Sequence, residues 1–445
     1  MRRLCLRLTL LLTAVCASLN STAAQNPCVP SAPQTSAPLA VRTLKLKADS
    51  EVALEIEARS PGASWARQGS EAAALVVTVD GVYNQDVLLW AGDTPHTYEV
   101  LLGRLSKGAH KIAVALNEAR SAAGARRAEV KALRPSLIEL EPDAHFAFAH
   151  APVLYARPNT IDHFTDIPLL MYYEVLNKGA DTVYRYTVVF TNEDGGTQTA
   201  ALFARWGRGT DIEWVYELRL RGGRVVAETF QGVQHETKSF NGQRTNGEHP
   251  LLAVASDNNN FSDLACSAVR FAPLPIPARL DAATRESMMD AQPATYRAMT
   301  EELRREGRIS DTPSDLNTIA DPREYIYVEA ASEQSGAAIA FDVKLKGHAE
   351  VFKSDMGEPR LRIERSGYYR TGIRLPKGFT SDAVESINAR CHPHPATPSG
   401  GTCKQLKLVR VLILRSDFAV QTLPLRPQPE ATLAAGETRL FRLGP

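Results

Sequence analysis

Short runs that alternate apolar and polar residues, separated by turn-forming residues, recur along most of this chain. Examples are "VALEIEA" (52–58), "ALVVTVDG" (74–81) and "HTYEVLL" (96–102). Such alternation turns one apolar face toward a core and is typical of half-buried antiparallel strands. The sequence therefore predicts a mainly β, multi-domain protein of antiparallel β-sandwiches. One stretch of helix formers (281–307), with Pro293 inside it and Gly307 at its end, predicts a short helical segment.

Changes in this pattern divide the 445 residues into successive parts. The central part contains several predicted strands, among them "AALFARWG" (200–207). The predicted parts are a signal peptide (1–24), a Pro/Ser-rich linker (25–38), an N-terminal jelly-roll-like sandwich (39–142), a central β-sandwich (143–277), a helical connector (278–310) and a C-terminal β region (311–445).

The first residues predict export. "MRRLCLRLTLLLTAVCASLNSTAAQ" has a basic start, a short apolar run and small residues that favour cleavage after Ala24. The apolar run is shorter than the roughly 20 residues that a membrane-spanning helix needs. No later stretch is apolar and long enough to span a membrane, so we expect a secreted or periplasmic protein with no transmembrane segment after signal cleavage.

The charge balance excludes one class of partner. Lys and Arg total 51 against 50 Asp and Glu, and both signs are interspersed. Nucleic acid or anionic lipid would need a basic block, which this chain lacks.

Four cysteines remain after the predicted signal cleavage: Cys28, Cys266, Cys391 and Cys403. They predict disulfides, because an exported protein with an even number of cysteines usually oxidises them. Cys391 and Cys403 flank a turn-rich loop whose ends can meet, and we pair them. Cys28 with Cys266 follows by elimination. A metal held through His392 and His394 in "CHPHP" is the alternative for that loop.

The N-terminal sandwich resembles the jelly-roll accessory domains that bind sugars on secreted proteins. The feature that carries this resemblance is "LSKGAHKIAVALN" (105–117), a Gly-Ala-His turn before a last strand. It implies that Trp65, Tyr83 or Trp90 stacks on sugar rings. The alternative is that these aromatic side chains belong to the core.

Two acids stand at alternate positions in "GRGTDIEWVYEL" (207–218). Because successive side chains of a strand point to opposite faces, Asp211 and Glu213 share one face about 7 Å apart. Two such carboxylates repel unless something positive lies between them. A hard divalent cation, Ca²⁺ or Mg²⁺, takes such oxygen ligands. A neighbouring arginine would also balance the pair, as a surface ion pair of little value to stability.

The central part resembles the vacuolar protein sorting-associated protein 62 family and, more distantly, the necrosis-inducing NPP-type cytolysins. The likeness rests on "HAPVLYARPNT", "VYRYTVVFTNEDGG", "WGRGTDIEWV" and "HPLLAVASDNNNF", the third of which resembles the "GDWEHV" and "GHRHDWE" segments of those families. It implies a divalent cation held by Asp194 (or Glu193), Asp211 and Glu213. Where those families have histidines, this chain has Gly207 to Thr210, so membrane damage is not implied.

A long polar segment, "QGVQHETKSFNGQRTNGEHP" (231–250), follows the acid pair. Segments of this length in compact domains are often functional. His235 is a candidate fourth metal ligand that replaces the missing family histidine, or a general base. Trp206, Arg208, Glu236 and His249 are the candidate ligand-binding residues around the site; an exposed, inert role for the loop histidines is the alternative.

Catalytic motifs are absent: the sequence has no GxSxG, HExxH, P-loop or GxGxxG pattern. We therefore assign no catalytic residues and expect a binding role toward an extracellular glycan, glycolipid or envelope component, with Ca²⁺ or Mg²⁺ as the cofactor. One alternative is a secreted carbohydrate-active hydrolase that uses Asp211 and Glu213 as its two carboxylates. The other is a structural envelope protein whose acids only balance arginines.

Overall fold

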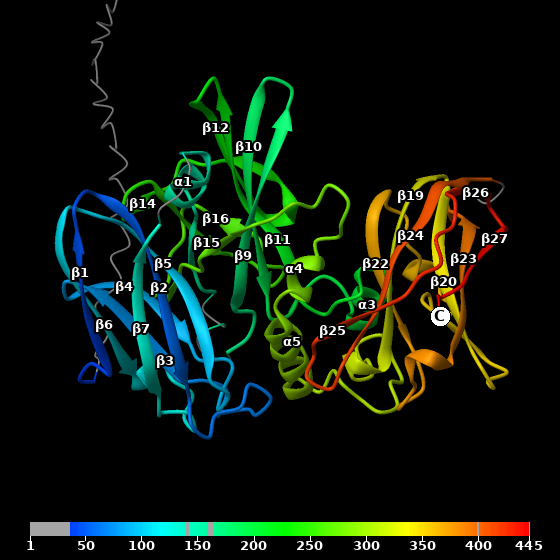
Figure 1. Cartoon of the computed structure of the whole chain (residues 1–445), viewed down its shortest axis with the longest axis horizontal. Coiled ribbons are helices and arrows are strands. Elements are labelled where there is room, and N and C mark those ends of the chain that lie inside the picture. The colour runs from blue at the N-terminus through cyan, green and yellow to red at the C-terminus, as the bar shows by residue number, and fades with distance from the viewer. Residues whose placement is uncertain (1–35, 139–141, 158–159, 161–163, 398–399, 445) are drawn as a thin grey trace, which may run out of the picture.

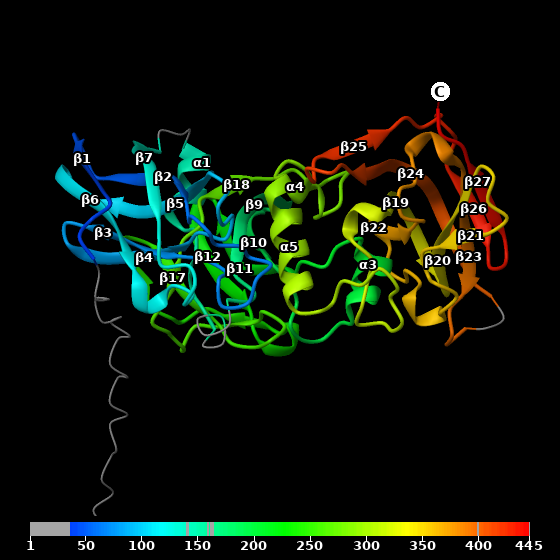
Figure 2. The same cartoon turned by 90° about the horizontal axis from the view of Figure 1, so that it is seen from below.

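The computed structural model describes residues 36–138, 142–157, 160, 164–397 and 400–444. The predicted signal peptide and Cys28 lie outside these residues. Three β-rich bodies follow one another along the longest axis of the molecule (Figure 1). The view from below places the helices α4 (Ser287–Asp290) and α5 (Pro293–Arg305) between the central and C-terminal bodies (Figure 2).

The first body is a sandwich of a four-stranded sheet, β1-β6-β3-β4, and a three-stranded sheet, β5-β2-β7. Its strands pair antiparallel, as the alternating sequence predicts. Asp80 and Gly81 form the turn between β3 and β4, both with positive φ, as a two-residue hairpin requires. The strands are β1 (Ala40–Leu46), β2 (Ser50–Arg59), β3 (Ala74–Val79), β4 (Val82–Leu88), β5 (His96–Leu105), β6 (Gly108–Asn117) and β7 (Glu129–Leu137).

The three aromatic residues singled out in this body belong to the core. Trp65 is fully buried, and Tyr83 and Trp90 are each less than a tenth exposed. The ring of Trp65 meets Phe164 edge-on, with ring centroids 6.5 Å apart. None of the three rings offers a face on which a sugar could stack.

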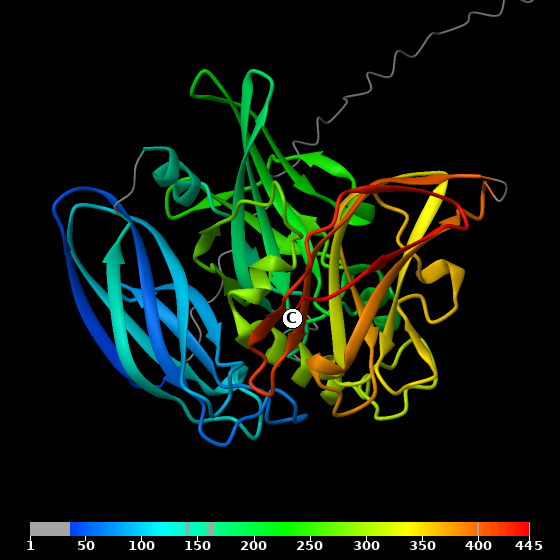
Figure 3. The same cartoon turned by 45° about the vertical axis from the view of Figure 1, so that its right-hand side comes forward.

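The central body contains two sheets, one of order β13-β12-β11-β10-β9-β18 and one of order β14-β15-β8-β17 with β16 beside β15. The long hairpins β9–β10 and β11–β12 project beyond the rest of the molecule (Figure 3). The strands are β8 (Val153–Tyr155), β9 (Pro168–Lys178), β10 (Asp181–Phe190), β11 (Ile212–Arg221), β12 (Arg224–Gln231), β13 (Thr237–Ser239), β14 (Arg244–Thr245), β15 (His249–Val254), β16 (Phe261–Ser262), β17 (Arg270–Phe271) and β18 (Pro275–Pro277), and the helices are α1 (Pro142–Ala149) and α3 (Thr199–Trp206).

The prediction of a strand at 200–207 is wrong, because this segment is helix α3. Its apolar residues Ala200, Leu202 and Phe203 are buried on one side of the helix. In a segment of only eight residues, the apolar pattern of such a helix cannot be distinguished from that of a strand. Gly207 ends the helix with φ 64°, the left-handed conformation common just after a helix end.

The helical connector contains α4 (Ser287–Asp290) and α5 (Pro293–Arg305). Pro293 is the first residue of α5 rather than an interruption, and Gly307 follows its end with φ 72°. The buried side of α5, with Tyr296, Met299 and Leu303, joins residues of both the central and the C-terminal bodies in one apolar cluster. The connector therefore packs between these two bodies and contributes to their shared core.

The C-terminal body packs the sheet β22-β19-β24-β25, with β26 beside β24, onto the sheet β21-β20-β23-β27. Cys391 and Cys403 form the predicted disulfide, with Cα atoms 6.1 Å apart, so their thiols do not hold a metal. Cys266 is also disulfide-bonded; its pairing with Cys28 stays a prediction. The strands are β19 (Tyr325–Ser335), β20 (Ala337–Leu345), β21 (Val351–Lys353), β22 (Gly367–Arg374), β23 (Val384–Pro393), β24 (Thr402–Leu414), β25 (Val420–Leu423), β26 (Ala431–Ala434) and β27 (Thr438–Phe441).

The predicted fold class is confirmed: the chain is mainly β and consists of packed, predominantly antiparallel sheets, with parallel pairs only at β8–β15 and β9–β18 among the described strands. Short helices occur at α1 and α3 as well as in the expected connector. Among the described residues, no helix has both the length and the apolar character to cross a bilayer.

Candidate functional site

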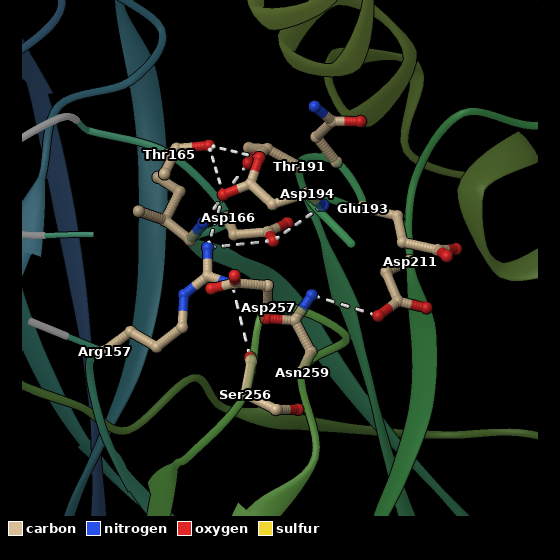
Figure 4. A network of polar contacts seen from close by, with 12 residues as sticks. Arg157, Thr165, Asp166, Thr191, Glu193, Asp194, Asp211, Ser256, Asp257 and Asn259 are labelled. Carbon is tan, nitrogen blue, oxygen red and sulfur yellow. Dashed lines mark hydrogen bonds and ion pairs between the residues drawn. The ribbon is translucent and has the colours of Figure 1, made fainter. Parts of the chain in front are cut away.

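The pairing of β10 with β11 brings three acids together. The strands run antiparallel with Val188 opposite Glu213, and the amide of Phe190 donates to the carbonyl of Asp211 at 2.9 Å. The turn that follows β10 therefore lies beside the start of β11. As a result Glu193, from that turn, lies beside Asp211 (Figure 4), and Asp211 in turn interacts with Glu213. We call Glu193, Asp211 and Glu213 the central acid cluster.

Burial makes ionisation of this cluster unfavourable. Glu193 and Asp211 are at most 5% exposed. Desolvation, followed by the charge of Asp211, raises the pKa of Glu193 to about 7. Desolvation, followed by the charge of Glu213, raises the pKa of Asp211 to about 7. Desolvation also raises the pKa of Glu213. At neutral pH the three carboxyls share protons or need a positive charge.

Uncharged amides surround the acids. Asn259 Nδ2 donates to Asp211 Oδ2 at 3.0 Å, and Gln231 Nε2 donates to Glu213 Oε2. With its oxygen toward His235, Asn258 donates from Nδ2 to Glu193 Oε1 at 3.2 Å. These amides stabilise the carboxylates by hydrogen bonding without supplying a full charge.

His235 stands at the open side of the cluster. Its ring is about half exposed, and Nδ1 lies 3.8 Å from Glu213 Oε2. Gln231 Nε2 also donates to Nδ1 at 3.0 Å, so the lone pair of this nitrogen points inward. Gln234 and His235 have φ 61° and 60°, a left-handed conformation that is strained for residues other than glycine. Asn260 Oδ1, which accepts from the Gln234 amide at 3.2 Å, helps to hold this strained turn.

The arginines near the cluster make their hydrogen bonds elsewhere, although the charge of Arg208 opposes the rise in the pKa of all three carboxyls and that of Arg285 opposes it at Asp211 and Glu213. Arg208 is buried and pairs with Glu286 at 3.0 Å, and its other nitrogen donates to the carbonyl of Thr210. Arg285 donates to the carbonyl of Ile212 at 2.9 Å. Within the described part of the chain, no lysine or arginine nitrogen lies within 4 Å of a carboxylate oxygen of the cluster, and the ring of His235 is the one basic group within that distance.

The structure thus brings together Asp211, Glu213 and His235 of the candidate metal ligands. The acid that joins them from the turn after β10 is Glu193, the alternative to Asp194. Asp194 turns to the other side, where its carboxylate accepts from Arg157 Nη2 at 2.5 Å and from Thr165 Oγ1 at 3.1 Å (Figure 4).

The other candidate ligand-binding residues, Trp206, Glu236 and His249, have their side chains engaged with partners outside the central acid cluster. The ring of Trp206 is in contact with two guanidinium groups, that of Arg205 at 4.7 Å and that of Arg365 at 5.1 Å from the ring centroid. Glu236 is exposed and pairs with Lys238 at 3.5 Å. His249 is fully buried; its Nε2 lies 3.0 Å from Glu51 Oε2, so it links the central body to the first sandwich.

Sequence reasoning missed the amides. The "NNN" run (258–260) carried a signal, because three asparagines in a polar turn after β15 are unusual for a plain connection. Gln231 carried none, since a single glutamine at a strand end is common.

No family model matches the chain, and no curated protein matches it. The C-terminal domain of EclA, a sugar-binding protein, aligns with 23% of this chain and 71% of its own at 17% identity, with a TM-score of 0.18. The chemokine binding protein R17 of rodent gammaherpesvirus Peru aligns with 80% of this chain and 81% of its own at 9% identity, with a TM-score of 0.13. TM-scores this low carry no argument about fold or function.

Proposed function

We propose that this chain is an exported binding protein whose central acid cluster, with His235, holds a divalent cation through which it binds a hydroxyl-rich ligand such as a glycan. The observation that carries the proposal is a row of three neighbouring buried carboxyls, Glu193 beside Asp211 and Asp211 beside Glu213, with no ion pair to a lysine or arginine among the described residues. Ca²⁺ and Mg²⁺ prefer such oxygen ligands. A cation would replace the shared protons and relieve the repulsion.

The strained turn supports a functional role for His235. Left-handed residues other than glycine cost of order 1–3 kcal/mol each, and such strain concentrates at binding and active sites. Here it places the inward-facing Nδ1 beside Glu213. A solvent-exposed, inert histidine would need no such conformation.

The surroundings favour a neutral polar ligand. A cation held on its buried side by Glu193, Asp211 and Glu213 keeps coordination positions free on its solvent-exposed side, near His235. Hydroxyl oxygens of a sugar fit such positions, and amides such as Asn258 can donate to and accept from neighbouring hydroxyls. The Cys391–Cys403 disulfide is compatible with an extracellular setting, where such ligands occur.

Binding to a panel of soluble polysaccharides in Ca²⁺ and in EDTA tests this function. We expect retention by at least one polysaccharide in Ca²⁺, lost in EDTA and in the Asp211→Asn/Glu213→Gln variant. Glu217→Gln is the matched control, because Glu217 lies on the same strand but pairs with Arg185. Absence of any cation-dependent retention would contradict the proposal and favour a structural envelope protein.

A hydrolase is the second candidate, because an acid with a pKa near 7, such as Glu193 or Asp211, suits general acid catalysis. The same panel distinguishes it. Release of reducing ends that the Asp211→Asn/Glu213→Gln variant loses would assign catalysis to the cluster, whereas retention without product release keeps the binding role.

A further inference from the structure

A second group of acids meets where helix α5 approaches the central body. The hydroxyl of Thr165 lies 2.8 Å from Glu302 Oε1, 3.1 Å from Asp194 Oδ1 and 3.2 Å from Glu306 Oε1. We call Thr165, Asp194, Glu302 and Glu306 the junction cluster. Glu302 also accepts from the indole nitrogen of Trp65 at 2.8 Å, so the cluster connects α5 with the first sandwich as well as with the central body.

One hydroxyl cannot satisfy three carboxylates. Thr165 has a single hydrogen to donate, so at most one of its three close contacts is a full hydrogen bond. One oxygen from each of Asp194, Glu302 and Glu306 lies within 4.8 Å of the others. Oxygens that share a Ca²⁺ ion, each at about 2.3–2.6 Å from it, have this spacing.

Arginines contact each acid of the junction cluster, and the shortest of these contacts joins Arg157 Nη2 to Asp194 at 2.5 Å. Arg308 Nε lies 3.0 Å from Glu306, whereas Arg305 Nη2 lies 3.9 Å from Glu302. The acids in and around the cluster outnumber the arginines. They are Asp166, Asp194, Asp257, Glu302 and Glu306, against Arg157, Arg305 and Arg308.

Buried oxygens without partners point to a missing ligand. Asn192 is fully buried and directs its amide at the cluster, where Nδ2 donates to Glu306 Oε2 at 2.7 Å. Its Oδ1 has no hydrogen-bond partner, and neither has Oδ1 of the buried Asp166. Buried polar atoms are nearly always paired, and a bound ion or water molecule beside them accounts for such exceptions.

An ion can reach this place. A cleft of about 710 Å³ between the first sandwich and α5 is lined by Thr165, Asp194 and Glu306. The cluster is therefore neither sealed in the core nor spread over an open surface, where acids are common without an ion.

We propose that the junction cluster is a second, structural divalent-cation site, which takes Ca²⁺ through Asp194, Glu302, Glu306 and the Thr165 hydroxyl. The bound ion fastens α5 to the first sandwich and the central body. Glu193 and Asp194 are adjacent in one turn and point to opposite sides (Figure 4), so one turn serves both cation sites.

Thermal unfolding with and without Ca²⁺ tests this site in the Asp211→Asn/Glu213→Gln background, where the central acid cluster no longer contributes. We expect Ca²⁺ to raise the Tm of this background by a few degrees and to leave the Tm of the same chain with Glu306→Gln unchanged. Glu301→Gln is the matched control, since it makes the same change on α5 outside the cluster.

Folding of the Glu306→Gln variant is expected, because desolvation and the charge of Glu302 raise the pKa of Glu306 to about 7 and the side chain is already partly neutral. A second measurement uses the unsubstituted chain: Ca²⁺ should change the fluorescence of Trp65, and Glu306→Gln should abolish the change. A Ca²⁺ response that survives Glu306→Gln, or no response in the background variant, would overturn the junction site while leaving the proposed function untouched.

Discussion

Replacement of Asp211 by asparagine should stabilise the cation-free protein at alkaline pH. Desolvation and then the charge of Glu213 raise the pKa of Asp211 to about 7, whereas an unfolded chain holds an aspartate near about 3.9. Between these values the folded state binds more protons than the unfolded state. The free energy of unfolding therefore falls as the pH rises through this window, and the loss is complete above it.

The magnitude follows from the shift. About three pKa units at about 1.4 kcal/mol each amount to about 4 kcal/mol. Asparagine is neutral at every pH and its Oδ1 can still accept from Asn259, at a cost of about 1 kcal/mol for the weaker bond. We expect a gain of about 3 kcal/mol near about pH 8, and a loss of about 1 kcal/mol near about pH 4.

Urea unfolding in EDTA at the two pH values measures this difference. Excess Ca²⁺ should then reverse the order at alkaline pH, because at about 1,000 times its Kd a ligand stabilises the folded state by about 4.1 kcal/mol, which exceeds the gain of the variant, and the variant has lost the site. If Asp211→Asn unfolds at lower urea than the unsubstituted chain at both pH values in EDTA, the carboxyl is not held in a proton-binding state and the reasoning fails.

Two further perturbations test the architecture by equilibrium unfolding. His249→Ala should lower stability by about 3 kcal/mol, because it leaves the buried Glu51 carboxylate without its partner; a loss below about 1 kcal/mol would mean that this contact is incidental. Gly207→Ala should cost more than about 2 kcal/mol, since its φ is positive and its Cβ would lie 2.7 Å from Arg370 Cγ. Gly222→Ala, also at positive φ but in open space, should cost about 1 kcal/mol, and equal losses would contradict the packing argument.

The sequence carried the β architecture because alternation is a local property of each strand. The hairpin at Asp80–Gly81 and the end of α5 at Gly307 were likewise predictable, since their turn chemistry is local. Helix α3 was missed because eight residues with a mixed apolar pattern fit both periods, and its packing against β22 is a contact between distant segments.

The candidate site was predictable in part. The strand period placed Asp211 and Glu213 on one face, and the polar loop contained His235. The choice between Glu193 and Asp194 depends on which way the turn after β10 is rotated, and this is set by Arg157 and Thr165 on the far side of Asp194. Such long-range contacts leave no local pattern in the sequence.

The junction cluster was beyond sequence reasoning for a related reason. Its members come from a loop, a turn and the end of α5, which lies more than a hundred residues after the other two segments. Glu302 and Glu306 resemble ordinary acids of an amphipathic helix and its end. Only the packing of α5 brings them to Thr165.

Calorimetric titration with Ca²⁺ and with Mg²⁺ tests the central claim most directly. In the Glu306→Gln background, which removes the junction site, we predict saturable binding of one ion per chain that disappears when Asp211→Asn and Glu213→Gln are added. If neither ion binds the Glu306→Gln chain, or binding survives the added substitutions, the central acid cluster is not a cation site and the proposed function is contradicted.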